Sequence, residues 1–264
     1  MKKDNEQRLL EILSVQQKIS LSETMKLFDI SESTARRLFA ELETKGLVIR
    51  THGGIHLTNV SLNSYSFESF EHANQDKKIA IAKKACELLR DGDNIFCDSG
   101  TTMQYFCNEL VTFSKKNALN ITVCTNSLVN LNILTPHIPV TLIGGDFRSN
   151  RRDFNGYIAE HALEKLYFDK CFVGTDGYIS PATFTTTDHG TARIDEIAIQ
   201  HSGSAYLLTD TTKFSRASHI AFVSAHELTA IITDSKLPKS IEHNITKQHC
   251  KIFYASNATP SANN

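Results

Sequence analysis

One stretch constrains the fold of this chain more than any other: residues 31–56, SESTARRLFAELETKGLVIRTHGGIH. Leucines recur at helical spacing behind serines that can cap a helix start. Gly46 follows, where a residue without a Cβ most easily ends a helix. Two short apolar runs, 47–50 and 55–58, then flank Gly53-Gly54, a pattern typical of a β-hairpin. The stretch therefore predicts a helix followed by a tight two-stranded ribbon.

The preceding residues predict two more helices. Residues 5–15 carry leucine and isoleucine at helical spacing. Ser20 and Glu23 have the spacing of a capping box, so the second helix is expected to begin near residue 19. Its apolar side is supplied by Met25, Leu27 and Phe28. Three helices and a ribbon predict a winged helix-turn-helix domain over residues 1–58.

In this fold the last helix enters the major groove of duplex DNA with its N-terminal side chains leading. Arginine suits that position because its guanidinium can form two hydrogen bonds to guanine. Residues 1–58 hold nine Lys or Arg against eight Asp or Glu, so net charge alone is weak evidence for DNA binding. A protein-interaction module with solvated arginines is the alternative. Contacts with double-stranded DNA are expected from Ser31, Ser33, Thr34, Arg36, Arg37, Arg50 and His52.

At these residues the chain resembles the DeoR family of bacterial transcriptional regulators. The family signature joins a Ser-x-x-Thr-x-Arg-Arg helix to an Arg-x-His-Gly-Gly wing. The chain departs from the family at Ala35, where a β-branched residue is usual, and at Leu38-Phe39, where Asp-Leu is usual. These departures bear on helix packing and operator preference and leave the arginines in place. The matching residues are Ser31, Thr34, Arg36, Arg37, Arg50, His52, Gly53 and Gly54.

Two polar segments mark boundaries along the chain. Residues 59–76, NVSLNSYSFESFEHANQD, are serine-rich with scattered aromatic residues and predict a linker. Residues 255–264, ASNATPSANN, predict a disordered tail. A length of 264 residues exceeds the ~100–200 typical of one domain, so residues 77–254 are expected to form a second one.

Strands and helices alternate through this second domain. Such alternation is typical of a mainly parallel sheet with helices on both faces. We therefore predict an α/β protein, with an N-terminal winged helix-turn-helix and a C-terminal, mainly parallel α/β domain. Short apolar strands are expected at residues 94–97, 121–124, 140–143, 171–173, 205–208 and 230–232.

Polar residues directly follow most of these strands. Parallel sheets bind ligands at the carboxyl ends of their strands, so one site is expected there. The hydroxyls and free N–H groups after residues 94–97 suit a phosphate, and Lys213 adds a positive charge for it. Asp98 and Asp176 can accept hydrogen bonds from sugar hydroxyls. Effector contacts are expected from Asp98, Ser99, Gly100, Thr101, Thr102, Thr125, Asn126, Gly144, Gly145, Asp176, Gly177 and Lys213.

Each of these signals has a structural alternative. Gly144-Gly145 is a common tight turn, and Thr125-Asn126 is a common strand-to-helix turn. Asp210 and Asp234 can simply cap the elements that follow them. Ser-Gly-Thr-Thr lacks the Gly-Lys-Ser/Thr ending of a nucleotide P-loop, so it does not indicate ATP. The shared position of these motifs after strands favours one joint site.

This half of the chain also resembles the DeoR family, over its C-terminal sensor domain. The resemblance implies a fold similar to ribose phosphate isomerase and CoA transferases, and a phosphorylated sugar or catabolic intermediate that alters operator binding. Where the family commonly has Glu-Ala and a downstream Lys, this chain has Thr191-Ala192 and Asp195-Glu196, so the effector is expected to be unusual. The matching motifs are Lys78 with Ile79-Ala80, residues 98–102, Thr125-Asn126-Ser127, Gly144-Gly145, Gly156, Asp169-Lys170, Gly174, Asp176-Gly177, Asp210, Lys213-Phe214 and residues 232–235.

Composition bounds the remaining possibilities. Six cysteines lie singly in apolar runs with no C-x-x-C, which predicts reduced core thiols in a cytoplasmic protein, without disulfides or a metal site. No apolar run approaches the ~20 residues that span a bilayer. The N-terminus lacks the apolar core of an export signal. We expect no cofactor and no membrane partner.

These observations predict a DNA-binding transcriptional regulator that represses a carbohydrate-catabolism operon and responds to a phosphorylated sugar or polyol. Readers of this kind act in pairs on repeated half-sites, so a homo-oligomer is expected. The alternative is a sugar phosphate isomerase with a fused helical domain, in which Asp98 and Asp176 act as acid and base and Lys213 steadies an enediolate. A DNA reader has no role in such turnover. A metal-dependent switch ranks lower, because none of the eleven histidines has ligand spacing.

Overall fold

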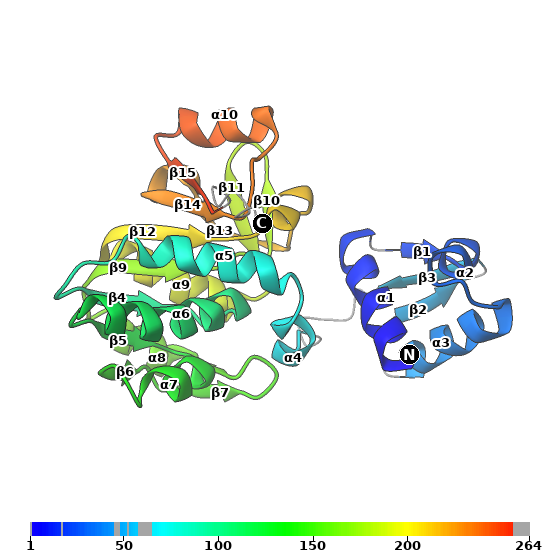
Figure 1. The fold of residues 1–264 in the computed structure, drawn as a ribbon, viewed down its shortest axis with the longest axis horizontal. Helices are drawn as coiled ribbons and strands as arrows, with labels where there is room; N and C mark the ends of the chain where they lie inside the picture. The colour runs from blue at the N-terminus through cyan, green and yellow to red at the C-terminus, as the bar shows by residue number, and fades with distance from the viewer. Residues whose placement is uncertain (1, 17, 45–47, 52, 58–64, 256–264) are drawn as a thin grey trace, which may run out of the picture. The chain divides into compact units, whose positions relative to one another are not determined.

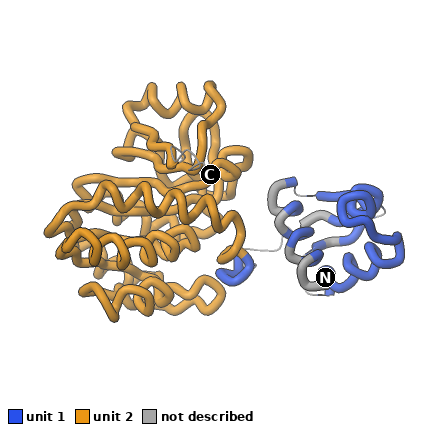
Figure 2. The backbone as a smooth tube through the Cα atoms, in the orientation of Figure 1, with its two compact units in different colours: residues 1–69 blue, residues 70–264 orange. Residues whose placement is uncertain are grey.

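The computed structural model describes residues 2–16, 18–44, 48–51, 53–57 and 65–255. The chain divides into two compact units, residues 1–69 and residues 70–264 (Figure 2). We call these the N-terminal unit and the C-terminal unit.

The N-terminal unit combines helices with a small antiparallel sheet (Figure 1). The central strand of that sheet, β3, pairs with both β1 and β2. The predicted helices and the wing hairpin are therefore confirmed. In its described residues the elements are α1 (Lys2–Gln16), β1 (Lys18–Ser20), α2 (Leu21–Phe28), α3 (Glu32–Thr44), β2 (Val48–Thr51) and β3 (Gly54–Leu57).

Local signals set the helix ends in this unit. Ser20 Oγ accepts the Glu23 N–H at 3.1 Å and the Glu23 carboxylate accepts the Ser20 N–H at 2.8 Å, so the predicted capping box is formed. Asp29 ends α2 in the left-handed region, at φ 49°. The Thr34 N–H then donates to Ser31 Oγ at 3.4 Å, at the start of α3. These caps confine the turn between the two helices to a few residues.

The strand β1 is the main departure from expectation in this unit. The sequence predicts a helix that begins near Ile19, but residues 18–20 form a strand that pairs Ile19 with Ile55. Gly54 allows this close approach, because a Cβ there would collide with the backbone of Ile19. In the wing, β3 thus pairs with β1, which precedes α2, as well as with β2, its partner in the hairpin.

The core of the N-terminal unit is apolar and contains side chains from α1, α3 and the sheet. Leu27, expected on the apolar side of α2, is instead 51% exposed. The helix end expected at Gly46 lies outside the described residues. The buried cluster consists of Leu9, Leu13, Ile19, Leu38, Phe39, Leu42, Val48 and Ile55.

The segment expected to be a linker contains a short helix, α4 (Phe67–Glu71). Phe67 is buried, and burying such a side chain stabilises local order by about 1.5–3 kcal/mol. The next helix, α5 (Gln75–Cys86), begins before the expected domain start at residue 77. Residues 58–64 lie outside the described part of the chain.

A parallel sheet forms the centre of the C-terminal unit, which confirms the predicted α/β class. Over the described residues its strand order is β15-β14-β12-β9-β4-β5-β6, and every neighbouring pair is parallel. The sequence did not predict β15. The strands are β4 (Asn94–Cys97), β5 (Thr122–Thr125), β6 (Val140–Leu142), β9 (Phe168–Val173), β12 (Ser202–Leu208), β14 (Ala230–Thr233) and β15 (Lys251–Tyr254).

Helices cover both faces of this sheet (Figure 1). α5, α6 (Thr101–Asn117) and α7 (Leu128–Leu134) lie on one face, and α8 (Tyr157–Leu163) and α9 (His189–Gln200) lie on the other. For the helices that connect strands, this division follows from right-handed crossovers between parallel strands, because the chain moves along the sheet in one direction after β4 and in the other after β9. α10 (Lys239–Lys247) connects β14 to β15.

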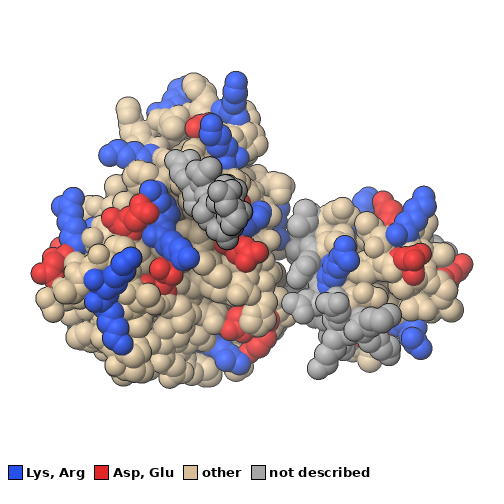
Figure 3. Space-filling model, in the orientation of Figure 1, with Lys and Arg blue, Asp and Glu red and all other residues tan. Residues whose placement is uncertain are grey.

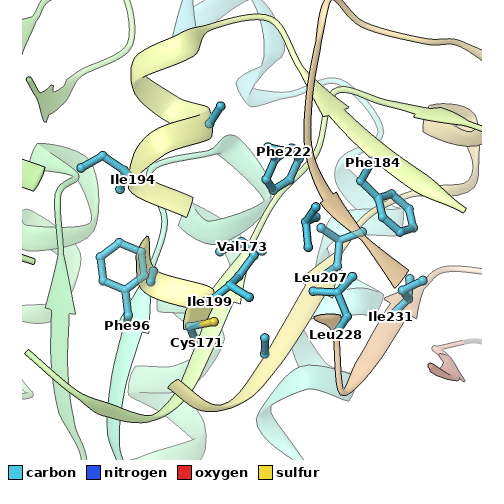
Figure 4. Packing of buried hydrophobic residues seen from close by; sticks show 14 of the residues in the cluster. Phe96, Cys171, Val173, Phe184, Ile194, Ile199, Leu207, Phe222, Leu228 and Ile231 are labelled. Atoms are coloured by element: carbon cyan, nitrogen blue, oxygen red, sulfur yellow. The ribbon is translucent and has the colours of Figure 1, made fainter. Parts of the chain in front are cut away.

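Apolar side chains fill both sides of the sheet. Successive residues of a strand point to opposite faces, so on β9 Cys171 and Val173 belong to one core cluster and Phe172 to the other. Figure 4 shows the first cluster, in which Ile194 and Ile199 of α9 lie near strand residues. Burial on both faces explains why these strands are continuous apolar runs rather than alternating ones.

Two smaller β structures, which the sequence did not predict, flank the main sheet. β10 (Gly177–Ile179), β11 (Thr183–Thr186) and β13 (Ile220–Ser224) form an antiparallel sheet. β7 (Asp146–Arg148) and β8 (Asp153–Asn155) form a hairpin. The short 3-10 helices are η1 (Thr211–Ser215) and η2 (Ala225–Glu227).

Buried polar and thiol groups also belong to the scaffold. Lys170 Nζ lies 2.6 Å from Asp93 Oδ2 in a buried ion pair, and Asp169 Oδ2 accepts the Asn94 N–H at 2.8 Å, so these pairs join β9 to the start of β4. All six cysteines are buried and unpaired. Within the described residues, no helix has both the length and the apolar character needed to cross a bilayer.

Candidate functional site

The N-terminal half of α3 presents polar side chains to solvent. Ser31, Ser33, Arg36 and Arg37 are exposed, and Thr34 is partly exposed. The Ser31 hydroxyl lies 3.0 Å from Ser33 Oγ and 2.9 Å from Thr34 Oγ1. The same helix buries its opposite face in the core of the unit. This arrangement leaves the four predicted DNA-contacting residues of α3, and Ser31 just before it, on the outer side of the helix.

The two arginines of α3 differ in their surroundings. Arg36 Nε donates to Glu32 Oε1 at 2.7 Å, one helical turn earlier. Among the described residues, the Arg37 side chain has no hydrogen-bond or ion-pair partner. The exposed ion pair between Arg36 and Glu32, one helical turn apart, contributes only about 0.3–0.5 kcal/mol to stability. Both side chains can therefore reach a DNA duplex, and Arg37 can do so without losing any contact.

The wing contributes Arg50 from β2. Arg50 Nη1 lies 3.7 Å from Glu43 Oε2, and the Arg50 N–H donates to Glu43 Oε1 at 3.2 Å. His52, the other residue predicted on the wing, lies outside the described residues. Both signs of charge are interspersed on the face of the protein that Figure 3 draws.

The predicted effector residues begin at the centre of the parallel sheet. The order of strands reverses between β4 and β9, which are neighbours. Ligands of such sheets commonly bind outside the carboxyl ends of the strands at a reversal of this kind. Asp98 follows β4 and Gly174 follows β9, and the Gly174 N–H donates to Asp98 Oδ2 at 3.3 Å. The two loops thus meet at the predicted edge.

The β7–β8 hairpin adds a charged cluster to this edge. Arg148 and Asp153 are paired residues of the hairpin, and Arg148 donates to both carboxylate oxygens of Asp153, at 2.8 and 2.7 Å. Ser99 Oγ donates to Asp153 Oδ2 at 2.8 Å, which links the hairpin to the loop after β4. Arg148 also donates to Asp188 and, at 3.1 Å, to Thr191 Oγ1 near the start of α9.

Lys213 and Asp176 form a second charged group. Lys213 Nζ lies 3.9 Å from Asp176 Oδ1, and Thr187 donates to Asp176 Oδ2 from its hydroxyl at 2.9 Å and its N–H at 3.1 Å. Burial opposes ionisation of Asp176, but Lys213 and then Arg151 hold its pKa below the ordinary value. Burial and then Arg216 lower the pKa of Lys213. Several cations therefore surround one ionised carboxylate.

Asp195 of α9 places another carboxyl group beside Asp98. It is 1% exposed, and its Oδ1 has no hydrogen-bond partner among the described residues. Burial, followed by the charges of Asp98 and Asp176, raises the pKa of Asp195 well above its usual 3.8. Burial also raises the pKa of Asp98. Neighbouring buried carboxyl groups favour holding a proton over carrying two charges.

The start of α6 supplies backbone donors at the same edge. Gly100 is the N-cap residue and no side chain caps it. The Met103 N–H donates to Gly100 O at 2.9 Å, so the N–H groups of Thr101 and Thr102 precede the first hydrogen bond of the helix. A long helix carries partial positive charge at this end. The arrangement suits an anion such as phosphate.

Thr125 and Asn126 are engaged inside the scaffold. Thr125 Oγ1 donates to Cys97 O at 2.6 Å and accepts the Ser127 N–H at 3.2 Å. Asn126 Nδ2 donates to Phe154 O at 3.0 Å. Asn126 Oδ1 is buried with no partner in the described part of the chain. These residues hold β4, β5 and the hairpin together, and only Asn126 retains an unused polar atom.

Backbone packing places two of the three predicted glycines that follow strands, Gly145 and Gly177, but not Gly144. A Cβ at Gly145 would collide with Asn155 O of the hairpin, and a Cβ at Gly177 would lie 2.6 Å from Arg216 O. Gly144 is exposed, with nothing within 4 Å of an added Cβ. Each lies after a strand as predicted, but these contacts concern neighbouring chain segments.

The charged residues that sequence reasoning missed are Arg148, Asp153 and Asp188. The signal for Arg148 and Asp153 is the polar run 148–153, RSNRRD, which follows no predicted strand, and Asp188 lies outside that run. The alternative role considered for Asp210, capping the element that follows it, is confirmed, because Asp210 Oδ1 accepts the Thr212 N–H of η1 at 2.9 Å. For Asp234 this role is wrong: Asp234 Oδ1 accepts the Thr211 N–H of η1, which precedes it, at 2.7 Å, and Pro238 is the N-cap residue of the next helix, α10.

A separate groove of 410 Å³ lies near the C-terminal end of α6 and contains none of the predicted site residues. Its polar lining includes Ser114, Lys115, Asn120 and His137. In the described ranges, no group of three or more His, Cys, Asp or Glu side chains is placed to hold a metal ion.

Two family models match the chain, one in each half. The model of the DeoR-like helix-turn-helix domain matches residues 6–60. The model of the DeoR C terminal sensor domain matches residues 73–235. Together they account for most of the sequence.

Named relatives align over nearly the whole chain. The lactose phosphotransferase system repressor of Lactococcus lactis subsp. lactis is 35% identical over 246 residues, which cover 91% of this chain and 94% of the relative. The protein of the same name from Staphylococcus epidermidis is 30% identical over 243 residues, covering 89% and 92%. Among solved structures, ribose 5-phosphate isomerase A from Methanocaldococcus jannaschii is similar, with a TM-score of 0.42 and 20% identity over 54% of this chain and 55% of that chain.

Proposed function

The chain belongs to the DeoR family of transcriptional regulators, and we propose that its N-terminal unit binds operator DNA while its C-terminal unit binds a phosphorylated sugar or polyol that changes this binding. It is a DNA-binding regulator and not an enzyme. We expect it to repress a carbohydrate-catabolism operon, as the relatives named lactose phosphotransferase system repressors suggest by analogy.

Operator reading is assigned to α3 and the wing. The exposure of the N-terminal half of α3 supports base or phosphate contacts by Ser31, Ser33, Thr34, Arg36 and Arg37. Arg50 of β2 and His52 are expected to contact the DNA backbone or the minor groove beside it. Since each chain has one reader, two or more copies are expected to act on repeated half-sites, in the cytoplasm where the DNA lies.

Effector binding by the C-terminal unit is supported above all by one observation: hydroxyl groups, carboxyl groups and cations come together at the carboxyl ends of β4 and β9. The N–H groups of Thr101 and Thr102 and the ammonium of Lys213 are assigned to the phosphate. Asp98, Ser99 and Asp176 are assigned to the sugar hydroxyls. Gly100, Thr125, Asn126, Gly144, Gly145 and Gly177 complete the set of residues expected to line this site.

A melting-temperature screen with sugar phosphates tests the proposal. A ligand present at 100 times its dissociation constant stabilises the folded state by about 2.7 kcal/mol, which raises the melting temperature measurably. Lys213→Ala should lose most of that rise, whereas Lys236→Ala, which removes an exposed lysine after β14, should keep it. An equal rise in the wild type and Lys213→Ala would contradict the assignment of Lys213. Failure of every sugar phosphate to alter operator affinity would contradict the sensing role.

A further inference from the structure

The first residues of the C-terminal unit are held against the loop that carries Lys213. Phe70 is the first residue of this unit and belongs to α4 (Phe67–Glu71), whose first three residues are the last of the N-terminal unit. Several side chains between residues 70 and 78 touch η1. The contacts are the Phe70 ring centroid to Lys213 Nζ at 6.0 Å, Asn74 Nδ2 to Thr212 Oγ1 at 3.5 Å, and Lys77 Nζ to Thr211 Oγ1 at 3.3 Å.

Lys78 holds the same segment from inside the protein. Its Nζ donates to Phe70 O at 2.6 Å and lies 3.5 Å from Glu71 O. The Tyr105 hydroxyl of α6 donates to that Glu71 carbonyl at 3.1 Å. Lys78 is 5% exposed, and no carboxylate of the described residues lies within ion-pair distance of its ammonium. A buried ammonium is thus held by backbone carbonyls at the point where the chain enters the unit.

The ammonium groups of Lys78 and Lys213 influence each other. Burial, and then the charge of Lys213, lowers the pKa of Lys78 to about 8. An anion bound at Lys213 would offset this repulsion, and the Lys78 ammonium would then hold the Phe70 and Glu71 carbonyls more firmly. The anion would also compete with the Phe70 ring for Lys213. Both changes act on the same short segment.

We infer that residues 70–78 transmit effector binding towards the N-terminal unit, with Phe70 and Lys78 as positioning residues that respond to an anion at Lys213. This inference rests on the proposed function, because it requires an anionic effector at that site. A ligand shifts a protein between two states only through its difference in affinity for them. Here the difference in affinity arises from the strength of two contacts with residues 70–78: the hydrogen bonds from the Lys78 ammonium to the backbone carbonyls, and the contact of Lys213 with the Phe70 ring.

The test separates effector binding from effector response in the full-length protein. Lys78→Met removes the ammonium, and Phe70→Leu removes the ring while keeping an apolar side chain. Lys83→Met is the matched control, since Lys83 lies on the same helix and is exposed. The probe is whichever of ribose 5-phosphate, fructose 6-phosphate and glucose 6-phosphate binds the wild type most tightly by calorimetry. Operator affinity is measured with and without that probe, using duplexes selected by the wild type from a random library.

Allosteric effectors typically change affinity by about 5–150-fold. We expect Lys78→Met and Phe70→Leu to bind the probe with an affinity within about threefold of that of the wild type. Adding the probe should change the operator affinity of these variants by less than about twofold, because the coupling between the two sites is lost. The control should respond like the wild type. A full response in both variants would overturn the inference. Loss of probe binding in both would also overturn it, because the segment would then belong to the binding site itself.

Hydrogen exchange in the unaltered protein gives a readout that needs no variant. Amides of residues 65–78 should change their exchange rates when the probe is bound, because Lys78 then holds the Phe70 and Glu71 carbonyls more firmly while the anion competes with the Phe70 ring for Lys213. Unchanged exchange there, with slower exchange around residues 98–102 and 213, would overturn transmission and leave the proposed effector site standing. A wild type that binds none of the probes would overturn the proposed function and this inference with it.

Discussion

Arg37 offers the sharpest single-residue test of DNA reading. It is exposed on α3 and has no partner among the described residues, so its removal leaves every internal contact described here intact. If its guanidinium binds a guanine, Arg37→Ala should weaken operator binding by about 1–3 kcal/mol and relax base preference. Gel shifts with the selected operator and with single-base variants measure both effects.

Arg37→Lys distinguishes the two ways in which that arginine can bind. Lysine keeps the charge but not the planar fork. Retained affinity with unchanged base preference would indicate a phosphate contact. Loss in both variants would indicate base reading. Full operator retention by Arg37→Ala would count against docking through the start of α3.

Asp195 predicts a dependence of stability on pH. Its pKa is raised well above 3.8 in the folded protein by burial and then by Asp98. At pH values between the unfolded-state and folded-state pKa of Asp195, folding therefore takes up a proton. The stability that the protonated carboxyl group contributes below this pH range is lost as the pH rises through it. Asp195→Asn removes the ionisation, so it should increase the free energy of unfolding at pH 8 more than at pH 5.

Urea unfolding at the two pH values measures this difference. Glu196→Gln is the matched control, because Glu196 is the neighbouring acid on α9 and its nearest cation is Arg193, 3.5 Å away near the surface. That variant should shift stability by a similar small amount at both pH values. Equal behaviour of Asp195→Asn and the control would show that Asp195 ionises normally.

At the scale of elements, β1 makes the wing a three-stranded structure, and Gly54 permits it. A Cβ at Gly54 would collide with the Ile19 backbone, whereas nothing lies within 4 Å of one at Gly53. Overpacking of this kind typically destabilises by about 1–3 kcal/mol. Gly54→Ala should therefore destabilise the N-terminal unit and weaken operator binding, while Gly53→Ala should do neither. Circular dichroism melts and gel shifts measure the two variants; equal stability of both would refute the close approach.

Elements with strong periodic signals could be predicted, and those made by tertiary pairing could not. The capping box at Ser20 and the apolar run of β4 are local, so the sequence specified them. β1 has three residues, too few for a period of two to be visible, and it exists because Ile19 pairs with Ile55. The polar hairpin β7–β8 likewise depends on Arg148 and its partners in other elements.

Residues of the candidate site likewise differ in whether a local sequence signal could reveal them. Asp98 and Lys213 could be predicted because each follows a strand or lies close after one, where parallel sheets place ligands. Arg148 could not, because its position depends on a hairpin whose strands have three residues each, too few to show a period of two. Asp188 could not, because its ion pair with Arg148 joins segments far apart in the sequence. Asp195 was noticed only as part of a departure from a family pattern, and its burial beside Asp98 became evident from the fold.

At the scale of the whole molecule, one reader per chain predicts assembly. A regulator that uses paired readers binds half-sites separated by about 10–10.5 base pairs or a multiple of that distance. Sedimentation should therefore show a dimer or a larger assembly, and titration should show two chains per operator. Shortening the spacing by about half a helical turn should abolish tight binding. Tight binding of one chain to one half-site would contradict this prediction.

The burial of all six cysteines makes the native chain suitable for optical labelling. Burial raises the pKa of Cys124, Cys171 and Cys250 to about 12, and the thiolate is the form that attacks maleimide reagents. Cysteines introduced at the exposed positions Lys26 and Lys239, one in each unit, can then carry a donor and an acceptor dye while all six native thiols stay in place. Energy transfer between the dyes would follow the separation of the two units in real time.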